Sequence, residues 1–236
     1  MFTQKEENFG ALILGILKRL TRGMDEESSF HLKVLGERLL DLHENGEVDV
    51  NHSVMELICA KELILSGYLV NLNHTLDSNL TCDVHAVKGE GVLILEVETG
   101  YIPPGHALNP NTSNQAKISS KISQYSPRAS KFGLATPNST ILQIPYLFIK
   151  PPRDRSYEEV ERIRKLCNQF YPNPPISFDQ IKDARLHNIV LIDIDHGHTR
   201  EIDPETYQEL QARMDALVTY SWEWKDRDVD ASSLHH

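Results

Sequence analysis

Apolar residues recur at helical spacing through the first 67 positions of the chain. Residues 9–20 carry them along one side and end in a basic cluster, which suits a helix C-terminus. Serines at 28 and 29 can cap a second helix that runs to Gly46. The stretch Ser53-Val-Met-Glu56 matches a capping box and predicts a third helix that stops at Gly67.

After Gly67 the pattern changes to alternating or continuous apolar runs that are typical of strands. We predict strands over residues 68–72, 80–87, 91–99, 132–135, 141–150 and 188–194. Helices are predicted over 114–125, 157–170 and 204–220, and a loop rich in Pro, Asn and Gly over 101–114. The expected fold is therefore mixed α/β (α+β), with a mixed central sheet flanked by helices. We expect an N-terminal helical extension at 1–50, a core at 51–225 and a disordered tail at 226–236.

Composition excludes several classes of protein. With 40% hydrophobic and 25% charged residues in a chain of 236, general disorder is excluded. The three cysteines are scattered and form no CxxC pair, which argues against a disulfide framework or a thiolate zinc site and favours the reducing cytoplasm. The most apolar N-terminal stretch, residues 11–17, is too short to span a membrane, so no membrane partner is expected.

The charge is distributed unevenly along the chain. A net charge of −10 argues against a protein that coats nucleic acid through bulk electrostatics. Residues 99–153, however, hold no Asp or Glu and six basic residues, namely Lys117, Lys121, Arg128, Lys131, Lys150 and Arg153. This segregation indicates either one basic face on an acidic body or chance clustering of surface charge.

Three acidic residues lie on neighbouring predicted strands. Glu96 and Glu98 share one side of their strand because side chains alternate with period two. A hairpin through Lys88–Gly91 brings Asp83 close to both of them. Three carboxylates this close raise one another's pKa unless a cation joins them, and hard oxygen ligands suit Mg²⁺ or Mn²⁺. The pattern predicts a metal site.

Glu62 is a fourth candidate ligand. It lies in the third predicted helix, which is otherwise apolar nearly all round, and an unpaired buried carboxylate is costly. The alternative is that Glu62 lies on a solvated edge of the helix beside Lys61.

The order of these features resembles the PD-(D/E)xK nuclease superfamily: a helix with Glu, a strand, a strand with Asp, a strand with Glu-x-Lys, and a helix. The resemblance covers residues 60–144 and is carried by Glu62, by Asp83 after Cys82, and by Glu96-Val-Glu98. It implies a restriction-endonuclease-like or resolvase-like core in which Asp83 and Glu96 hold Mg²⁺ or Mn²⁺ and Glu62 assists. The implied reaction is metal-assisted phosphodiester hydrolysis.

Two departures from the superfamily pattern matter. Cys82 replaces a proline whose position varies widely, whereas Glu98 replaces the lysine that normally orients or activates the attacking water. Glu98 would then be a further metal ligand or the general base. Lys117 and Lys121 lie at i, i+4 on the following helix, where Lys121 could replace the lost lysine and Lys117 could clamp a phosphate. The alternative is that both are ordinary solvated lysines.

The sequence thus favours a divalent-metal-dependent nuclease that binds nucleic acid, DNA before RNA, through residues 99–153. The alternative is a non-catalytic nucleic-acid or protein-binding module on a degenerate nuclease fold. A third reading is a phosphohydrolase site at Asp193–His198, a segment that also fits a polar hairpin tip. Residues 1–50 are open to three roles: a homodimer surface, a lid or a DNA-contacting appendage.

Overall fold

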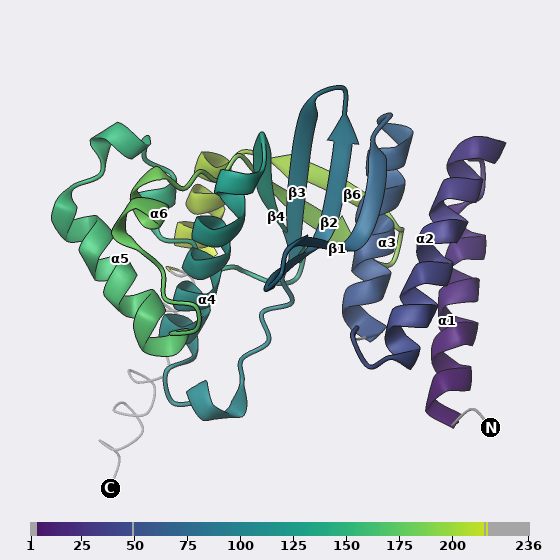
Figure 1. Cartoon of the computed structure of the whole chain (residues 1–236), viewed down its shortest axis with the longest axis horizontal. Helices are drawn as coiled ribbons and strands as arrows, with labels where there is room; N and C mark the ends of the chain where they lie inside the picture. The colour runs from purple at the N-terminus through teal and green to yellow at the C-terminus, as the bar shows by residue number, and fades with distance from the viewer. Residues whose placement is uncertain (1–3, 49, 215, 217–236) are drawn as a thin grey trace, which may run out of the picture.

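A computed structural model describes residues 4–48, 50–214 and 216. Figure 1 shows one β-sheet between two groups of helices. On one side lie α1 (Gln4–Leu20), α2 (Glu26–Glu44) and α3 (Val50–Leu65), and on the other lie α4 (Pro110–Tyr125), α5 (Tyr157–Phe170) and α6 (Phe178–Asp183). The predicted fold class, a mixed α/β sheet flanked by helices with an N-terminal helical region, is confirmed.

The six strands follow one another in the sheet in chain order. They are β1 (Leu69–Asp77), β2 (Leu80–Lys88), β3 (Gly91–Val97), β4 (Lys131–Pro137), β5 (Asn188–Asp193) and β6 (His198–Ile202). The first three strands are antiparallel, β3, β4 and β5 are parallel, and β6 is antiparallel to β5. The chain passes from β3 to β4 through α4, so the residues at the end of β3 lead directly to that helix.

Alternation along the strands divides the buried side chains into two cores. Leu93, Leu95 and Val97 of β3 pack with the N-terminal helices, whereas Ile94 packs with Ile118 and other residues of the α4 side. Both clusters are apolar and almost fully buried. The apolar stripes of α1 and α2 belong to the first cluster, so these helices share one core with α3 and the sheet.

The predicted strand over residues 141–150 is wrong. This segment is irregular, with a short 3-10 turn at Tyr146–Phe148. Pro145 lacks the N–H that a central strand must donate, and the N–H of Leu142 donates to the Tyr207 hydroxyl at 2.7 Å instead. Two short elements, α6 and β6, are not predicted by the sequence; β6 begins at His198, the last residue of the predicted hairpin tip.

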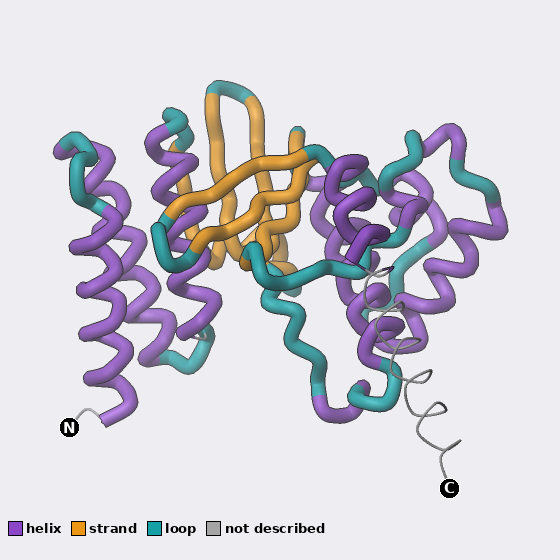
Figure 2. The backbone as a smooth tube through the Cα atoms, turned by 180° about the vertical axis from the view of Figure 1, so that it is seen from behind, coloured by secondary structure: helices purple, strands orange, loops and turns teal. Residues whose placement is uncertain are grey.

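The C-terminal part is described only in its first portion. Residues 204–214 are helical, whereas the predicted helix end at 220 and the predicted tail at 226–236 lie outside the described residues. Residues 98–109, between β3 and α4, form a long loop that projects from the body of the molecule (Figure 2). None of the described helices is long and apolar enough to cross a membrane.

Gly133 of β4 allows close packing between β3 and β5. A Cβ atom at this position would lie 2.1 Å from Asn188 Oδ1 and 2.7 Å from Leu95 Cδ2. We therefore expect Gly133→Ala to lower the free energy of unfolding by about 1–3 kcal/mol, as overpacking does. Urea denaturation measures this, and adding Asn188→Ala should recover part of the loss by removing the clashing amide.

The matched control is Gly15→Ala on the exposed side of α1, where an added Cβ has nothing within 4 Å. Alanine there should raise the free energy of unfolding by about 0.5–1 kcal/mol. Equal effects of the two glycine substitutions would contradict the packing described for β4.

Candidate functional site

Strands β2 and β3 separate where the candidate acids lie. Their backbone pairing starts at Lys88–Gly91, as predicted, and ends at the pair Val84–Leu95. Beyond this pair, Asp83 Oδ2 accepts a hydrogen bond from the Val97 N–H at 2.7 Å, and Glu96 Oε1 accepts one from the Asp83 N–H at 3.0 Å. Two carboxylates therefore replace the backbone acceptors between the strands, which fixes both side chains.

Two lysines from α4 contact these acids. Lys121 Nζ lies 2.6 Å from Glu98 Oε1, 2.9 Å from Glu96 Oε2 and 3.8 Å from Asp83 Oδ2. Lys117 Nζ lies 2.7 Å from the other Glu98 oxygen. Five of the six site residues predicted from the sequence are therefore brought together, and neither lysine is an ordinary solvated helix residue.

The lysines keep Glu98 ionised and are kept protonated by the acids. Burial raises the pKa of the Glu98 carboxyl, but the nearby charges of Lys121 and Lys117 outweigh it and hold that pKa below its ordinary value. Burial opposes the charge of Lys121, yet Glu96, Asp83 and Glu98 together hold its pKa well above the usual value. At neutral pH the amino group of Lys121 is thus an ammonium, a hydrogen-bond donor and not a base.

Glu56 of α3 is a site residue that the sequence analysis missed. Its side chain is 2% exposed and accepts a hydrogen bond from Asn73 Nδ2 at 3.1 Å. Burial, then the charges of Asp83 and Glu96, raise its pKa well above the ordinary value. The predicted capping box assigned Glu56 to the first turn of the helix. In the structure α3 is helical from at least Val50, so Ser53 is not its N-cap and Glu56 lies inside the helix.

The structure does not bring Glu62 to this cluster. Glu62 Oε1 lies 3.2 Å from Lys61 Nζ and 3.2 Å from Nδ1 of His198, at the start of β6. Glu56, six residues earlier on the same helix, is the glutamate whose pKa depends on Asp83 and Glu96.

The cluster contains more carboxyl groups than ammonium groups. Glu56, Asp83, Glu96 and Glu98 supply four carboxyl groups, against the two ammonium groups of Lys117 and Lys121. Burial, then the charge of Asp83, raise the pKa of Glu96 to about 8, and the pKa of Glu56 is also raised, so protons on these two groups offset the surplus at neutral pH. Among the described residues there is no group of three or more His, Cys, Asp or Glu side chains that could hold a metal ion. Instead, the Lys121 ammonium contacts the carboxylates.

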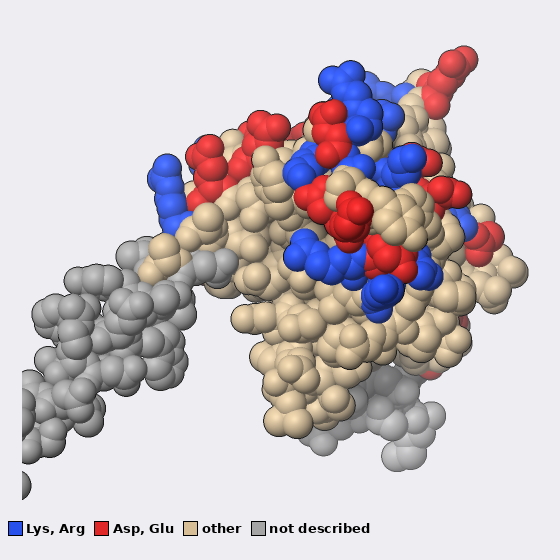
Figure 3. All heavy atoms as spheres, turned by 90° about the vertical axis from the view of Figure 1, so that its left-hand side faces the viewer, with Lys and Arg blue, Asp and Glu red and all other residues tan. Residues whose placement is uncertain are grey.

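The six basic residues of segment 99–153 do not form one continuous basic face. Lys117 and Lys121 pair with the buried acids, Arg128 pairs with Asp77 at 2.9 Å, and Lys150 pairs with Glu159. Figure 3, which looks onto the side of α5 and α6, shows acidic and basic side chains interleaved. Within the described ranges, Lys131 forms no ion pair, and Arg153 approaches only Asp154, at 3.7 Å with its side chain 86% exposed.

The Asp193–His198 segment is the tip of the β5–β6 hairpin. Asp193 accepts hydrogen bonds from the backbone N–H of His196 at 3.0 Å and pairs with the ring of the same residue. The turn passes through Gly197 at a φ of 69°, a left-handed conformation that favours glycine. Lys61 Nζ donates to the Gly197 carbonyl at 3.1 Å. These contacts account for the polar residues as turn and capping groups.

Comparisons with known proteins give little further guidance. No protein-family model matches the chain, and no curated protein matches it in sequence. Among solved structures, a CdiA-CT/CdiI toxin and immunity complex from Burkholderia pseudomallei is similar at 18% sequence identity, with a TM-score of 0.25. That match covers 65% of this chain and 86% of the other. A similarity at this level carries no argument about function.

The raised pKa of Glu96 predicts how Glu96→Gln changes the pH dependence of stability. The folded protein holds this proton up to about pH 8, whereas the unfolded chain releases it near its ordinary value of 4.5. Between these values the folded state binds more protons, so this contribution to stability is lost as pH rises. The unfolding free energy of the wild type minus that of Glu96→Gln should therefore fall from pH 5 to pH 8.

Urea titrations in EDTA at four pH values measure this difference. Burial lowers the pKa of His85 and His187, which makes the free energy of unfolding rise with pH. Both histidines are present in the wild type and in the variant, so their contribution cancels when one free energy is subtracted from the other. Glu90→Gln, at the exposed β2–β3 turn, is the matched control and should show no such trend. A difference that is constant with pH would show that Glu96 is ionised throughout.

Proposed function

We propose that this protein is a divalent-metal-dependent nuclease whose site is formed by Asp83, Glu96, Glu98, Lys117 and Lys121. One observation carries the proposal: carboxylates from β2 and β3 and an ammonium from α4 converge where the two strands separate. The arrangement supports the resemblance to PD-(D/E)xK nucleases, with the lysine of the strand motif supplied by the following helix.

Asp83 and Glu96 are the residues that would hold Mg²⁺ or Mn²⁺. Mg²⁺ binds proteins through one or two carboxylates, keeps several waters and completes its shell with substrate phosphate, so a two-carboxylate site fits it. The cluster has two more carboxyl groups than ammonium groups, and release of the protons on Glu56 and Glu96 would supply the two negative charges that balance one divalent ion. When bound, the ion would polarise the scissile phosphate and lower the pKa of the attacking water.

Lys121 would stabilise the negative charge that develops on the phosphate. Its ammonium is already oriented by three carboxylates, so little reorganisation accompanies the reaction. Glu98 has both carboxylate oxygens directed at ammonium groups, Lys121 on one and Lys117 on the other. We therefore assign Glu98 to positioning the two lysines rather than to binding the metal.

The substrate in this proposal is a polynucleotide, with DNA favoured over RNA. The loop of residues 98–109 begins at the site and carries the exposed side chains of Tyr101 and Leu108. Long loops beside a rigid scaffold commonly contact substrate, and this loop leads from Glu98 to the helix that carries both lysines.

A cleavage assay with Mg²⁺ or Mn²⁺ on mixed DNA and RNA substrates tests the proposal. The wild type should cut, and Asp83→Asn and Glu96→Gln should abolish metal-dependent cutting because the ligands are lost. Lys121→Met should lower the rate by about 10²–10³-fold, the usual cost of removing one preorganised donor. Titration calorimetry should show Mg²⁺ or Mn²⁺ binding to the wild type that is lost in Asp83→Asn.

Asp154→Asn and Lys165→Met are the matched controls, since both side chains are largely exposed and away from the cluster. They should cut like the wild type. Cutting that persists in Asp83→Asn would refute the site. Metal binding without cleavage of any substrate would instead favour the non-catalytic binding module.

A further inference from the structure

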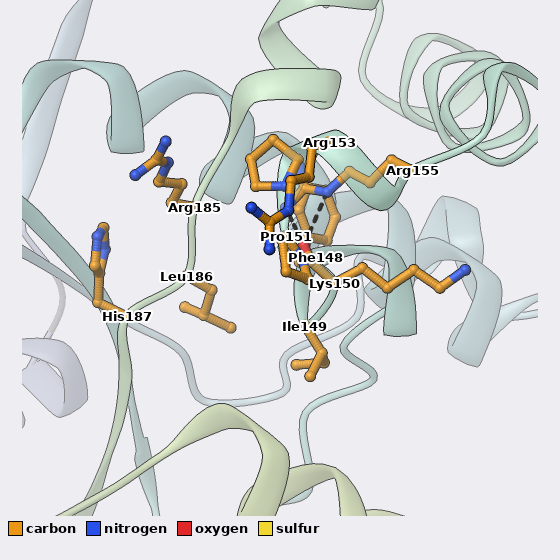
Figure 4. Close-up of a pocket in the computed structure, with 10 residues that line it drawn as sticks. Phe148, Ile149, Lys150, Pro151, Arg153, Arg155, Arg185, Leu186 and His187 are labelled. Carbon is orange, nitrogen blue, oxygen red and sulfur yellow. Dashed lines mark hydrogen bonds between the residues drawn. The ribbon is translucent and has the colours of Figure 1, made fainter.

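A basic hollow lies away from the carboxylate cluster, beside the N-terminal end of β5. Its volume is about 540 Å³, and Arg153, Arg185, His187, Leu186, Ile149 and Pro151 are among its lining residues. Figure 4 shows Arg185, Leu186 and His187 on one side of it and Arg153 and Ile149 on the other. Its size is that of a small-molecule site.

Among the described residues, two cations of this hollow, Arg153 and Arg185, have no strong acidic partner. Lys150, which also lines it, is paired with Glu159, and the charge of Asp183 acts on Arg155. Arg185 is exposed and forms no ion pair within the described part of the chain, and Arg153 makes only its long, exposed contact with Asp154. The positive charge of Lys131, the first residue of β4, also acts on His187. The two basic residues of segment 99–153 that form no strong ion pair in the described chain, Lys131 and Arg153, thus both lie at or near this hollow.

A buried guanidinium makes the hollow rigid. Arg155 is 7% exposed and donates to the carbonyls of Lys150, Ile181 and Lys182 at 2.8–3.2 Å. These bonds join the loop that carries Arg153 to the segment that leads to Arg185. Burial lowers the pKa of Arg155 to about 10, so at neutral pH it adds positive charge to the wall.

His187 presents a fixed donor. Its Nδ1 accepts a hydrogen bond from the Phe132 N–H at 3.0 Å, so in the neutral ring the proton is on Nε2. Burial lowers the pKa of this imidazole, which favours the neutral form. The neutral ring can therefore place its Nε2–H donor near the two guanidinium groups without electrostatic repulsion between them.

We propose that this hollow binds the phosphate monoester of a nucleotide, either free or at the end of a polynucleotide strand. Two guanidinium groups match the two charges of a phosphate monoester and can each form paired hydrogen bonds with its oxygens. The His187 N–H supplies a further donor, and Leu186, Ile149 and Pro151 offer apolar contact to a sugar or base. The proposal is independent of the nuclease activity.

Binding is measured by titration calorimetry on the full chain at low salt in EDTA, so that the carboxylate cluster plays no part. The probes are AMP, adenosine, and one DNA oligonucleotide with either a 5′-phosphate or a 5′-hydroxyl. AMP should bind and adenosine should not. The double variant Arg153→Ala/Arg185→Ala should bind AMP at least about tenfold more weakly, since it loses two charge-assisted contacts.

Arg162→Ala, which removes an exposed arginine of α5 outside the hollow, is the matched control and should bind AMP like the wild type. Both substituted arginines are exposed, and an unchanged circular dichroism spectrum will show that the double variant folds. Tighter binding of the 5′-phosphorylated strand than of AMP would identify a strand end as the ligand, and equal binding a free nucleotide. Equal binding of AMP and adenosine, no binding of any phosphate probe, or unchanged affinity in the double variant would overturn the proposal.

Discussion

One ammonium group surrounded by three carboxylates is the interaction on which this half of the molecule depends. Lys121 holds α4 against β2 and β3 at the point where the strands separate, and it offsets charges that could not otherwise be buried together. Asp83 and Glu96 in turn replace backbone acceptors between the strands. The same contacts therefore support the sheet, orient the helix and define the candidate site, in which carboxyl groups with raised pKa values could exchange their protons for a cation.

The central part of this arrangement could be predicted because it follows from short-range rules. Period-two alternation places Glu96 and Glu98 together, a hairpin places Asp83 beside them, and i, i+4 spacing pairs Lys117 with Lys121. No such rule tells which side of a helix faces the site when the helix is apolar nearly all round. Six residues turn an α-helix by about 240° beyond a full turn, so choosing Glu62 in place of Glu56 selected the wrong side of α3.

Long-range pairing explains what else the sequence did not predict. A run of six cations without acids looks like a binding face, yet Asp77 and Glu159, from outside that run, neutralise two of them and the buried acids take two more. The distribution of charge along a sequence does not show such long-range ion pairs. The irregular segment 141–150 is similar: Tyr207 and Gln211 satisfy its N–H groups from the C-terminal helix, a role that no local pattern reveals.

The N-terminal helices hold both edges of the sheet. Arg19 of α1 donates to the carbonyls of Ile194 and Asp195 at the β5–β6 turn, and α2 contacts Val70 and Asn73 of β1 through His31 and Arg38. Arg19 and Asp195 are 176 positions apart in the chain. During synthesis from the N-terminus, α1 therefore emerges long before its partner at the far edge exists, and non-local closure of this kind is slow. The apolar side of α1 packs on α2 and α3 as soon as these helices have emerged, but its contact with the far edge of the sheet is completed only when β5 and β6 have formed.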